Sequence, residues 1–444
     1  MKILNPNIKA LSNIFRKNNY HLYLVGGAIR DYILGLNNDD YDFATDANPE
    51  EVMAMFPHLC IPTGIKHGTV TVLFNSSSYE ITTFRTEGDY EDSRHPNNVS
   101  FTRDLATDLE RRDFTINAFA YDVEKDELID LHSGKEDLDN KLIRAINNPL
   151  DRFTEDALRM LRACRFSAKL DFELEENTKE AIKVLKDRIK YVSSERIRDE
   201  IFKIVDSKHP AKGIELLRET KLLKYILPEL DKCIDVYQGG YHKDDVYRHS
   251  ITTLEMAKDS HMYVKLAALL HDIGKVSTKE LKPDGSYSFY KHEIVSSLEC
   301  AKILKRLKCS NKEIEIVSHL VKNHMFNYSS IWTDSAIRRF ILRVGIDNLE
   351  YLYDLRRADI KAIDNNPDFS KLEELIARVN AELTNKTFIS RADLKINGND
   401  LIKLGLKGVK IGKTLDYLFQ EVIQDPSLND NTLLIEKAKA FLLN

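Results

Sequence analysis

The sequence predicts an α+β protein, in which a small β-sheet head with helices precedes a long, mostly α-helical body. Three observations support this class. Leu22–Asp46 reads as a strand, a tight glycine turn, a short helix, a loop and a second strand. Gly68–Phe74 and Tyr79–Phe84 have the composition of two strands, and the turn-prone run Asn75–Ser78 joins them. From about residue 141 onward, apolar residues recur at helical spacing and glycine is sparse.

Composition limits what the protein can be. The chain has 444 residues, of which 43% are hydrophobic, and this is enough for several domains. Its net charge of -5 provides no overall basic field, so nucleic-acid binding would depend on local patches. The five cysteines are odd in number and form no Cys-x-x-Cys pair, which favours free thiols in the cytoplasm. No apolar stretch is long enough to span a bilayer, so we expect no membrane partner.

The glycine turn and the acidic pair in Leu22–Asp46 carry the first chemical signal. Gly26 and Gly27 allow the backbone to approach a ligand closely, and the start of the following helix suits a phosphate. Asp40 and Asp42 are two residues apart, so in a strand both carboxylates face one side and can hold Mg²⁺. Each motif alone also occurs by chance. Together they resemble the active-site signature of the polymerase-β nucleotidyltransferase superfamily.

A pair of arginines marks a second motif. Arg111 and Arg112 supply forked donors that fit phosphate oxygens. Asp113 and Asn117 follow closely and can bond to a ribose hydroxyl. An isolated Arg-Arg-Asp is more often an ordinary helix start with surface ion pairs, so this motif gains its meaning from its neighbours in the chain.

A third motif lies in the first part of the helical body. Thr154 is a suitable N-cap, and Glu155, Asp156 and Arg159 would then share one helix face. The simplest interpretation is a salt bridge on a solvated face. However, a carboxylate acceptor beside a guanidinium donor also matches the Watson–Crick edge of cytosine or adenine. Uracil and guanine present the reverse order, and a buried mismatch costs roughly 1–3 kcal/mol per unpaired group. Such a pair could select C and A without a nucleic-acid template.

Taken in order, these motifs resemble those of a known family. GGAIRD, DYD, RRDFTINA and EDALRMLRACRF, followed by the charged segment 194–200, are similar to the five-motif signature of class II tRNA nucleotidyltransferases, the CCA-adding enzymes. The resemblance covers residues 20–205. It implies a polymerase-β-type head, a neck with a base-reading helix, and helical body and tail domains that grip the tRNA acceptor stem. The implied reaction adds CMP and AMP from CTP and ATP to the tRNA 3′ end and releases pyrophosphate.

The resemblance also implies roles for individual residues. Asp40 and Asp42 match the catalytic carboxylates that bind Mg²⁺, and Glu80 is a candidate third carboxylate. Asp156 and Arg159 match the base-pairing residues, while the segment 194–200 is assigned to shaping the neck. The remaining nucleotide-binding candidates are Gly26, Gly27, Arg30, Arg111, Arg112, Asp113, Asn117, Arg152 and Arg162.

Three alternatives stay open on the sequence alone. The polar loop Thr86–Phe101 has the full length expected of enzymes that complete CCA, so addition of only two cytidines is disfavoured and A-only addition is an alternative. A bacterial poly(A) polymerase shares the head and neck motifs, but that family usually has a basic C-terminal extension and lacks the histidines described next. A non-catalytic tRNA- or nucleotide-binding protein is the third alternative, and the intact Asp40 and Asp42 argue against it.

A second candidate site falls in the helical body, around the run HDIGK at residues 271–275. It resembles the HD phosphohydrolase family. A lone helical histidine is usually structural, but several ligands in the order of the family favour a metal site, and imidazole with carboxylate suits Mn, Fe, Ni, Co or Zn. The resemblance implies hydrolysis of a phosphate ester at a tRNA end, with Lys275 on the phosphate; a remnant that only carries tRNA is the alternative. The matching residues are His249, His271, Asp272, His292, His324 and Asp359, of which His292 and His324 correspond to the two-metal variants.

The end of the chain suggests a further RNA contact. Asp393–Leu418 interleaves three glycines with Lys403, Lys407, Lys410 and Lys413, which can bind phosphates. A surface helix hairpin with ordinary lysines explains this pattern equally well. The expected partners are tRNA, CTP and ATP, and the sequence does not indicate an oligomeric state. We predict four parts, namely a catalytic head at 1–140, a neck at 141–235, an HD phosphohydrolase-like part at 236–370 and a tRNA-binding tail at 371–444.

Overall fold

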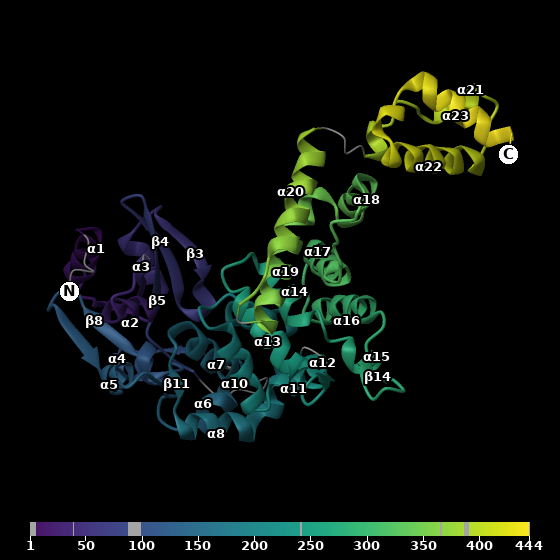
Figure 1. Ribbon diagram of the computed structural model, residues 1–444. Coiled ribbons are helices and arrows are strands. Elements are labelled where there is room, and N and C mark those ends of the chain that lie inside the picture. The colour runs from purple at the N-terminus through teal and green to yellow at the C-terminus, as the bar shows by residue number, and fades with distance from the viewer. Residues whose placement is uncertain are drawn as a thin grey trace. The chain divides into compact units, whose positions relative to one another are not determined.

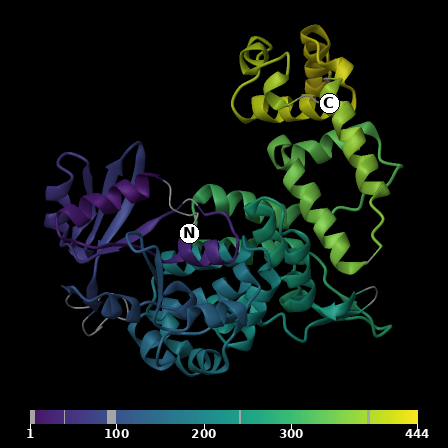
Figure 2. The same ribbon diagram turned by 90° about the vertical axis from the view of Figure 1, so that its left-hand side faces the viewer.

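The computed structural model contains two compact units, shown in two views in Figures 1 and 2. The first comprises Met1–Asp231 with Arg306–Lys308, and the second comprises Lys232–Lys305 with Cys309–Asn444. The structure describes residues 6–38, 40–87, 99–239, 242–364, 366–385 and 390–443.

A seven-stranded sheet forms the centre of the first unit, with the strand order β3-β4-β5-β2-β1-β8-β9. All neighbouring strands are antiparallel except β2 and β5, which run parallel. The predicted sheet-containing head is therefore confirmed, and with it the α+β class. The strands are β1 Leu22–Val25, β2 Asp42–Thr45, β3 Cys60–Gly64, β4 Thr69–Phe74, β5 Ser77–Thr83, β8 Phe119–Asp122 and β9 Glu127–Asp130.

The local sequence explains these strands and the helices beside them. The turn between β4 and β5 places Asn75 at φ 46° and Ser76 at φ 63°, which is the backbone that a tight hairpin needs. Val70 and Val72 alternate along β4 and are fully buried. Three helices pack against the sheet, as Figure 1 shows: α1 Pro6–Lys17, α2 Gly27–Ile33 and α3 Pro49–Met55.

The first unit continues through short strands into helices. The pair β6 Arg85–Glu87 and β7 Val99–Phe101 flanks the polar loop, whose central residues lie outside the described part of the chain, so the prediction about its length is not tested. The helix α7 Leu158–Leu170 packs against α9 Ser194–Val205 and α10 Pro210–Glu219. The other elements are α4 Leu105–Glu110, α5 Gly134–Asp139, α6 Pro149–Glu155, α8 Glu176–Leu185, α11 Leu223–Ile226, α12 Pro228–Asp231 and the strands β10 Leu142–Ile143 and β11 Glu173–Leu174.

The predicted helix with Thr154 as its N-cap is wrong. Asn148 caps α6 instead: its side chain accepts from Leu150 N, and Pro149 occupies the first turn. Thr154 therefore lies in the last turn of α6. Asp156 follows that helix with an extended backbone (φ -138°, ψ 104°), and α7 begins only at Leu158. Glu155, Asp156 and Arg159 thus do not share one continuous helix.

The second unit is mainly helical, with two small strand pairs that the sequence did not predict. The pairs are β12 Tyr237–Gly239 with β13 His242–Asp245, and β14 Glu280–Leu281 with β15 Tyr287–Ser288. The helices α13, α14, α17 and α19 pack together. The helices are α13 Val246–Met256, α14 Met262–Leu270, α15 Lys275–Thr278, α16 His292–Arg306, α17 Asn311–Asn323, α18 Asp334–Val344, α19 Leu349–Ile363 and α20 Ser370–Thr384.

The chain ends in three helices with their own core: α21 Gly398–Lys403, α22 Val409–Gln424 and α23 Asn431–Leu443. Leu401, Leu418 and Leu434 are fully buried between them. The lysines at 403, 407, 410 and 413 are exposed. No described helix combines the length and the apolar character that crossing a membrane requires.

Candidate functional site

A cleft of about 580 Å³ lies in the first unit. It brings together Asp40, Asp42, Asp156 and Arg159, although the two pairs are far apart in the sequence. Nine arginine and lysine side chains and five aspartates line it. The local excess of positive charge contrasts with the net charge of -5 of the whole chain, and it suits a polyanionic ligand.

The glycine turn forms one edge of this cleft. Gly26 has φ 75° and ψ -144° directly before α2, a conformation that other residues rarely adopt. A Cβ at this position would lie 3.6 Å from both Arg112 Nη1 and Asp42 Oδ2. That is ordinary van der Waals contact, so the positive φ and not the space is what requires glycine at position 26; Gly27 also lines the cleft.

Carboxylates crowd at the start of β2. Asp42 is the first residue of the strand, and its partner in the register of β5 is Glu80. Partial burial, together with the charges of Asp40 and Glu80, raises the pKa of Asp42, while Arg112 opposes this rise. Because like charges destabilise one another and all the donors are oxygens, this edge of the sheet fits a hard divalent cation.

Asp108, a residue that the sequence analysis did not single out, forms ion pairs with both arginines. Asp108, in α4, is 1% exposed and accepts from Arg111 Nη2 at 2.8 Å and from Arg112 Nη2 at 3.4 Å. Both arginines line the cleft. The Nε of Arg112 is buried and has no hydrogen-bond partner within the described chain. The pair is therefore fixed in place with a donor left over for a ligand.

A buried polar network connects α2 to the segment after the arginines. Arg30 is 3% exposed; its Nε donates to Asp31 Oδ1 at 2.8 Å and its Nη1 donates to Asn117 Oδ1 at 2.6 Å. Asn117 Nδ2 in turn donates to Asp113 Oδ1 at 3.1 Å. Arg30, Asp113 and Asn117 all line the cleft, so the motifs predicted to meet the nucleotide also hold one another.

Asp113 also links this network to α7. Arg162 donates to Asp113 Oδ2 through Nε at 2.7 Å, and its Nη2 lies 2.6 Å from the same oxygen. Burial is the largest single influence and would raise the pKa of Asp113, but the charges of Arg162 and Arg159 and the hydrogen bonds from Asn117 and Arg162 together lower this pKa below its usual value. Asp113 is therefore a carboxylate that stays ionised at neutral pH.

The two predicted base-reading residues each have a different partner. Asp156 accepts from Arg196 Nη2 at 2.8 Å and from Arg196 Nη1 at 3.3 Å. Arg159 Nη1 donates to Glu155 Oε2 at 2.6 Å, and its Nη2 donates to the carbonyl of Arg111 at 2.8 Å. Both side chains line the cleft from the break between α6 and α7. A ligand that uses their polar atoms must exchange partners with these residues.

Arg152 is placed differently from the other candidates. It lies in a neighbouring hollow of about 220 Å³ with Glu110 and Glu155, outside the lining of the main cleft. Its side chain forms an ion pair with Glu155 and donates to the carbonyl of Glu110 at 3.0 Å. Arg152 thus supports the residue that holds Arg159.

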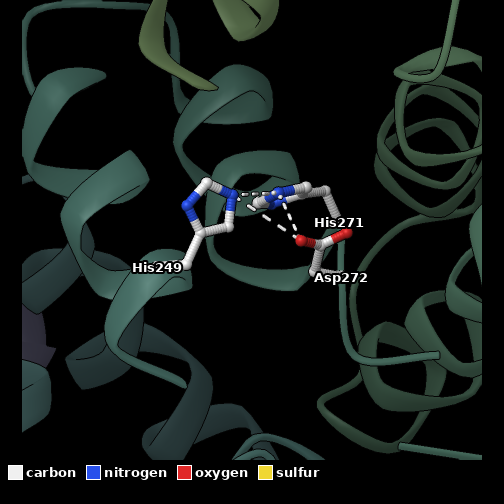
Figure 3. A group of neighbouring side chains, drawn as sticks. All are labelled: His249, His271 and Asp272. Atoms are coloured by element: carbon white, nitrogen blue, oxygen red, sulfur yellow. Dashed lines mark hydrogen bonds and ion pairs between the residues drawn. The ribbon is translucent and has the colours of Figure 1, made fainter. Parts of the chain in front are cut away.

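A second group of chemically active side chains lies in the second unit. His249 comes from α13, while His271 and Asp272 follow α14, and Figure 3 shows the two rings and the carboxylate turned toward one another. His271 Nε2 is 3.2 Å from both His249 Nε2 and Asp272 Oδ2. Asp359 Oδ1, from α19, lies 3.2 Å from His249 Nε2. These four residues are buried; the donor atoms of His249, His271 and Asp272 lie together, and Asp359 contacts the two histidines.

Asp272 is shared with a further pair of histidines. Its Oδ1 lies 3.2 Å from His292 Nε2 and 3.7 Å from His324 Nε2. The Nδ1 atoms of His271, His292 and His324 each lie within 2.9 Å of a backbone carbonyl, so they donate and leave Nε2 as the metal-binding atom. His292 Nε2 and Asp272 Oδ1 are buried without a hydrogen-bond partner in the described chain. The donor set therefore fits divalent metal, and Asp272 would belong to both groups of ligands.

Comparison with known proteins identifies the family. Family models match residues 22–144 (poly A polymerase head domain), 171–234 (RNA and SrmB binding site of polymerase A) and 291–438 (tRNA nucleotidyltransferase domain 2). The CCA-adding enzyme of Ligilactobacillus salivarius is 35% identical over 434 residues, which is 96% of this chain and 94% of the relative. The chain belongs to the CCA-adding enzyme family.

Other CCA-adding enzymes are similar to this nucleotidyltransferase in sequence or structure over almost all of its length. The CCA-adding enzyme of Oceanobacillus iheyensis is 34% identical and covers 95% of this chain and 93% of the relative. The crystal structure of the Bacillus stearothermophilus CCA-adding enzyme in complex with CTP has a TM-score of 0.75 at 27% identity, with 99% and 100% coverage. A Thermotoga maritima CCA-adding enzyme complexed with tRNA shares the fold, with a TM-score of 0.60 at 22% identity, covering 99% and 97% of the two chains. The family depends on divalent metal ions, and this CCA-adding enzyme shares that dependence.

Several cleft residues of this CCA-adding enzyme were missed in the sequence. Arg196 lies in the segment 194–200, whose predicted role is only to shape the neck, and its local spacing does not indicate that it meets Asp156. Arg165 and Lys169 lie one and two turns along α7 from Arg162, so helical periodicity could have placed them on the cleft face. Asp108 had no signal other than its position four residues before Arg112.

Proposed function

We infer that this protein adds CMP and AMP to the 3′ end of tRNA, using CTP and ATP and releasing pyrophosphate. The observation that carries the inference is the single cleft in which Asp156 and Arg159 lie with Asp40 and Asp42. A base-selecting pair and a catalytic pair in one pocket can choose a nucleotide and transfer it without a template strand. Membership of the CCA-adding family supports the same conclusion.

Asp40 and Asp42 would hold Mg²⁺ at the start of β2. When bound there, Mg²⁺ supplies Lewis-acid stabilisation of the α-phosphate and of the departing pyrophosphate. The two carboxylates would also take up the proton of the attacking tRNA 3′-hydroxyl. The new bond joins that oxygen to the α-phosphorus, and the bond from the α-phosphorus to the bridging oxygen breaks, so pyrophosphate leaves. Glu80 would add a third carboxylate at the same edge.

The basic side chains of the cleft would bind the triphosphate. Arg111 and Arg112 are held by Asp108, so their remaining donors are positioned before the ligand arrives. Arg30 joins α2 to Asn117 through its hydrogen bonds and would add positive charge beside the triphosphate. Asp113 and Asn117 would bond to the ribose. Arg162 lines the same cleft and holds Asp113.

Asp156 and Arg159 would read the base. In cytosine the exocyclic amine lies beside the N3 acceptor, and in adenine it lies beside N1, so a carboxylate and a guanidinium match either base. Asp156 must then share or release Arg196, and Arg159 must release Glu155 or one carbonyl. The energy difference between the right and the wrong base would arise because uracil and guanine would leave the buried Arg159 and the partly buried Asp156 without matching partners.

The deciding experiment uses tRNA that lacks its 3′ end and each labelled nucleotide in turn. We expect two C and one A on tRNA without CCA, and one A on tRNA that already ends in CC. Incorporation of A alone, with no C on the shorter tRNA, would identify an A-adding enzyme. Long A runs would identify a poly(A) polymerase, and no incorporation would leave only binding.

A second activity is proposed for the HD-type cluster of the second unit. The observation that favours it is Asp272, which belongs to both groups of buried donors, His249 with His271 and His292 with His324. This donor set suits Ni²⁺, Mn²⁺, Co²⁺, Fe²⁺ or Zn²⁺, and such a metal supplies an activated water when bound. We propose hydrolysis of a phosphate ester at a tRNA end, for example a 2′,3′-cyclic phosphate. The water oxygen bonds to phosphorus, one phosphorus–ribose oxygen bond breaks, and that oxygen takes up a proton.

A phosphodiesterase assay tests this second activity. Wild type is compared with His271→Ala and Asp272→Ala in the presence of added Ni²⁺ or Mn²⁺. We expect hydrolysis that needs metal and is lost in both variants. Absence of metal-dependent, mutation-sensitive activity would refute it and leave a module that only carries RNA.

The remaining assignments follow from these two activities. We propose that the head at 1–140 and the neck at 141–235 perform the transfer, and that the part at 236–370 holds the metal cluster. The tail at 371–444 would bind tRNA through the exposed lysines near Lys407 and Lys410. The reaction on tRNA and the free cysteines favour a cytoplasmic location.

A further inference from the structure

The metal-binding cluster has a polar neighbour that the sequence did not single out. Gln238, in β12, is 5% exposed. Its Oε1 accepts a hydrogen bond of 2.6 Å from Lys275 Nζ. The same ammonium donates to Asp272 Oδ2 at 2.7 Å. Asp272 is the carboxylate that both groups of donors share, so only one side chain separates Gln238 from the proposed metals.

The chemistry of Lys275 fixes the orientation of the Gln238 amide. An ammonium group only donates hydrogen bonds, so the amide oxygen must face it and Nε2 must point elsewhere. Nε2 is buried, and it has no hydrogen-bond partner in the part of the chain that the structure describes. Buried N–H groups without a partner are rare in folded proteins, because they lose water and gain nothing. This donor is therefore available to a group from outside the chain.

The surroundings indicate what that group is. His292 Nε2 and Asp272 Oδ1 are also buried without hydrogen-bond partners, and they are the proposed metal donors. Lys275 is 8% exposed and supplies a positive charge beside them. A ligand that meets a metal, an ammonium and an amide N–H in one place is an anion with several oxygens. Phosphate esters have this property, because their oxygens can accept from Gln238 Nε2 and from Lys275 while the ammonium keeps its ion pair with Asp272.

We propose that Gln238 extends the phosphate site that the HD resemblance implies for Lys275, as a second phosphate-binding residue beside the metal cluster. This inference rests on the phosphate-ester hydrolysis proposed above and names the residues that recognise its substrate. Gln238 has two tasks. Its Oε1 holds the ammonium of Lys275 in place, and its Nε2 donates to a phosphoryl oxygen of an RNA-end phosphate. The amide neither gains nor loses a proton, so Gln238 binds and positions the substrate.

Two substitutions separate these tasks. Gln238→Glu keeps an oxygen acceptor for Lys275 but removes the N–H donor and adds a negative charge that repels phosphate. Gln238→Ala removes both interactions. Gln420→Glu is the matched control, because it makes the same chemical change at an exposed position of α22, in the same unit. The metal content of each variant is measured first, together with its melting temperature.

The test is calorimetric titration of inorganic phosphate into the full-length protein loaded with Mn²⁺, with saturating CTP present to fill the cleft of the first unit. We expect phosphate affinity to fall at least tenfold in Gln238→Glu and Gln238→Ala, with unchanged metal content. The control should bind phosphate like wild type. In a parallel assay with bis(p-nitrophenyl) phosphate, the KM and the phosphate inhibition constant should rise more than kcat falls.

The outcomes separate this inference from the hydrolytic activity. Unchanged phosphate affinity in Gln238→Glu overturns the subsite, whether or not the wild type hydrolyses esters. Loss of metal in that variant also overturns it, because Gln238 would then act through Asp272. If the wild type hydrolyses nothing but binds phosphate in a way that depends on Gln238, the subsite stands and the proposed hydrolysis fails.

Discussion

Arg196 holds Asp156 through two hydrogen bonds, of 2.8 and 3.3 Å, across the gap between α9 and the start of α7. The carboxylate proposed to read the base is therefore oriented by an arginine from a different helix, and Arg159 is held separately by Glu155. An arginine fork fixes a carboxylate in its plane, but it also competes with an incoming base for the same oxygens. Arg196 thus determines both the direction and the availability of Asp156.

Replacement of Arg196 by Met should weaken nucleotide selection. Charge-assisted hydrogen bonds contribute about 1.5–3 kcal/mol, so kcat/KM for CTP and ATP should fall roughly ten- to hundredfold. The ratio of CTP to UTP incorporation should fall as well, because Asp156 loses its fixed direction. Incorporation of each labelled nucleotide into tRNA measures both effects.

The matched control is Arg198→Met, which changes the same residue type two positions along α9. Arg198 pairs with Asp199 at 2.8 Å and does not line the cleft, so transfer and selection should stay close to wild type. Equal C/A preference in Arg196→Met and wild type would contradict a role for Arg196 in base reading.

Asp42→Asn should abolish transfer but stabilise the metal-free protein. The loss of one metal ligand should lower kcat/KM by roughly a thousandfold or more, because metal stabilisation of a phosphoryl transition state amounts to several kcal/mol. The raised pKa of Asp42 predicts the second effect. Thermal unfolding without and with Mg²⁺ measures it.

The sign of the stability change follows from proton linkage. A carboxyl whose pKa is raised by folding binds its proton more tightly in the folded state, so its ionisation destabilises the fold as the pH rises. At pH 7 in the absence of metal, Asp42→Asn should therefore melt above wild type, and the difference should shrink as the pH falls through the range where Asp42 becomes protonated. Mg²⁺ should raise the melting temperature of wild type only. A variant that melts below wild type in chelator would show that the carboxylates do not repel one another.

Asp113→Asn should make the free energy of unfolding less sensitive to a fall in pH. The pKa of Asp113 lies below its usual value because the ion pair with Arg162, the hydrogen bond from Asn117 and the charge of Arg159 together outweigh burial. Its contribution to stability is fully present above the pKa of an unfolded aspartate, about 4, and is lost as the pH falls through the lower folded pKa. The variant should thus lose roughly 1–3 kcal/mol at pH 7, and the two proteins should converge in acid. Urea unfolding between pH 7 and pH 3 provides the measurement.

Asp139→Asn is the control for this pH series. Asp139 is exposed at the end of α5, so the substitution should leave unfolding unchanged at every pH. A constant difference between Asp113→Asn and wild type from pH 7 to pH 3 would mean that packing, and not ionisation, explains the effect.

Local signals account for the parts of the fold that were predicted. The strand, glycine turn and helix at residues 22–33 could be predicted because positive φ at Gly26 is a property of the backbone itself. The β4–β5 hairpin followed from the turn-prone run that begins at Asn75. The helix start near Thr154 was wrong because Asn148 and Pro149 provide a stronger N-terminus earlier in the chain.

Tertiary contacts account for the parts that could not be predicted. Arg196 meets Asp156 only because α7 and α9 pack side by side, and no spacing within α9 contains that information. Gln238 meets Lys275 of α15 from β12, which belongs to a strand pair that the sequence did not predict. The donors of the metal cluster come from five separate helices or helix ends, so only the resemblance to the HD phosphohydrolases grouped them before the structure did.

The metal cluster and the transfer site should prove to be chemically independent. Each is built within its own unit, and they share no residue. His271→Ala should therefore retain CCA addition within about twofold of wild type. The same substitution should abolish metal-dependent phosphodiesterase activity and the rise in melting temperature on adding Ni²⁺, since binding to the folded state alone stabilises it by mass action. Asp42→Asn should show the opposite pattern, with lost transfer and an intact response to Ni²⁺. Loss of both activities in His271→Ala at an unchanged melting temperature would mean that the cluster takes part in nucleotide transfer, and would refute this division of labour.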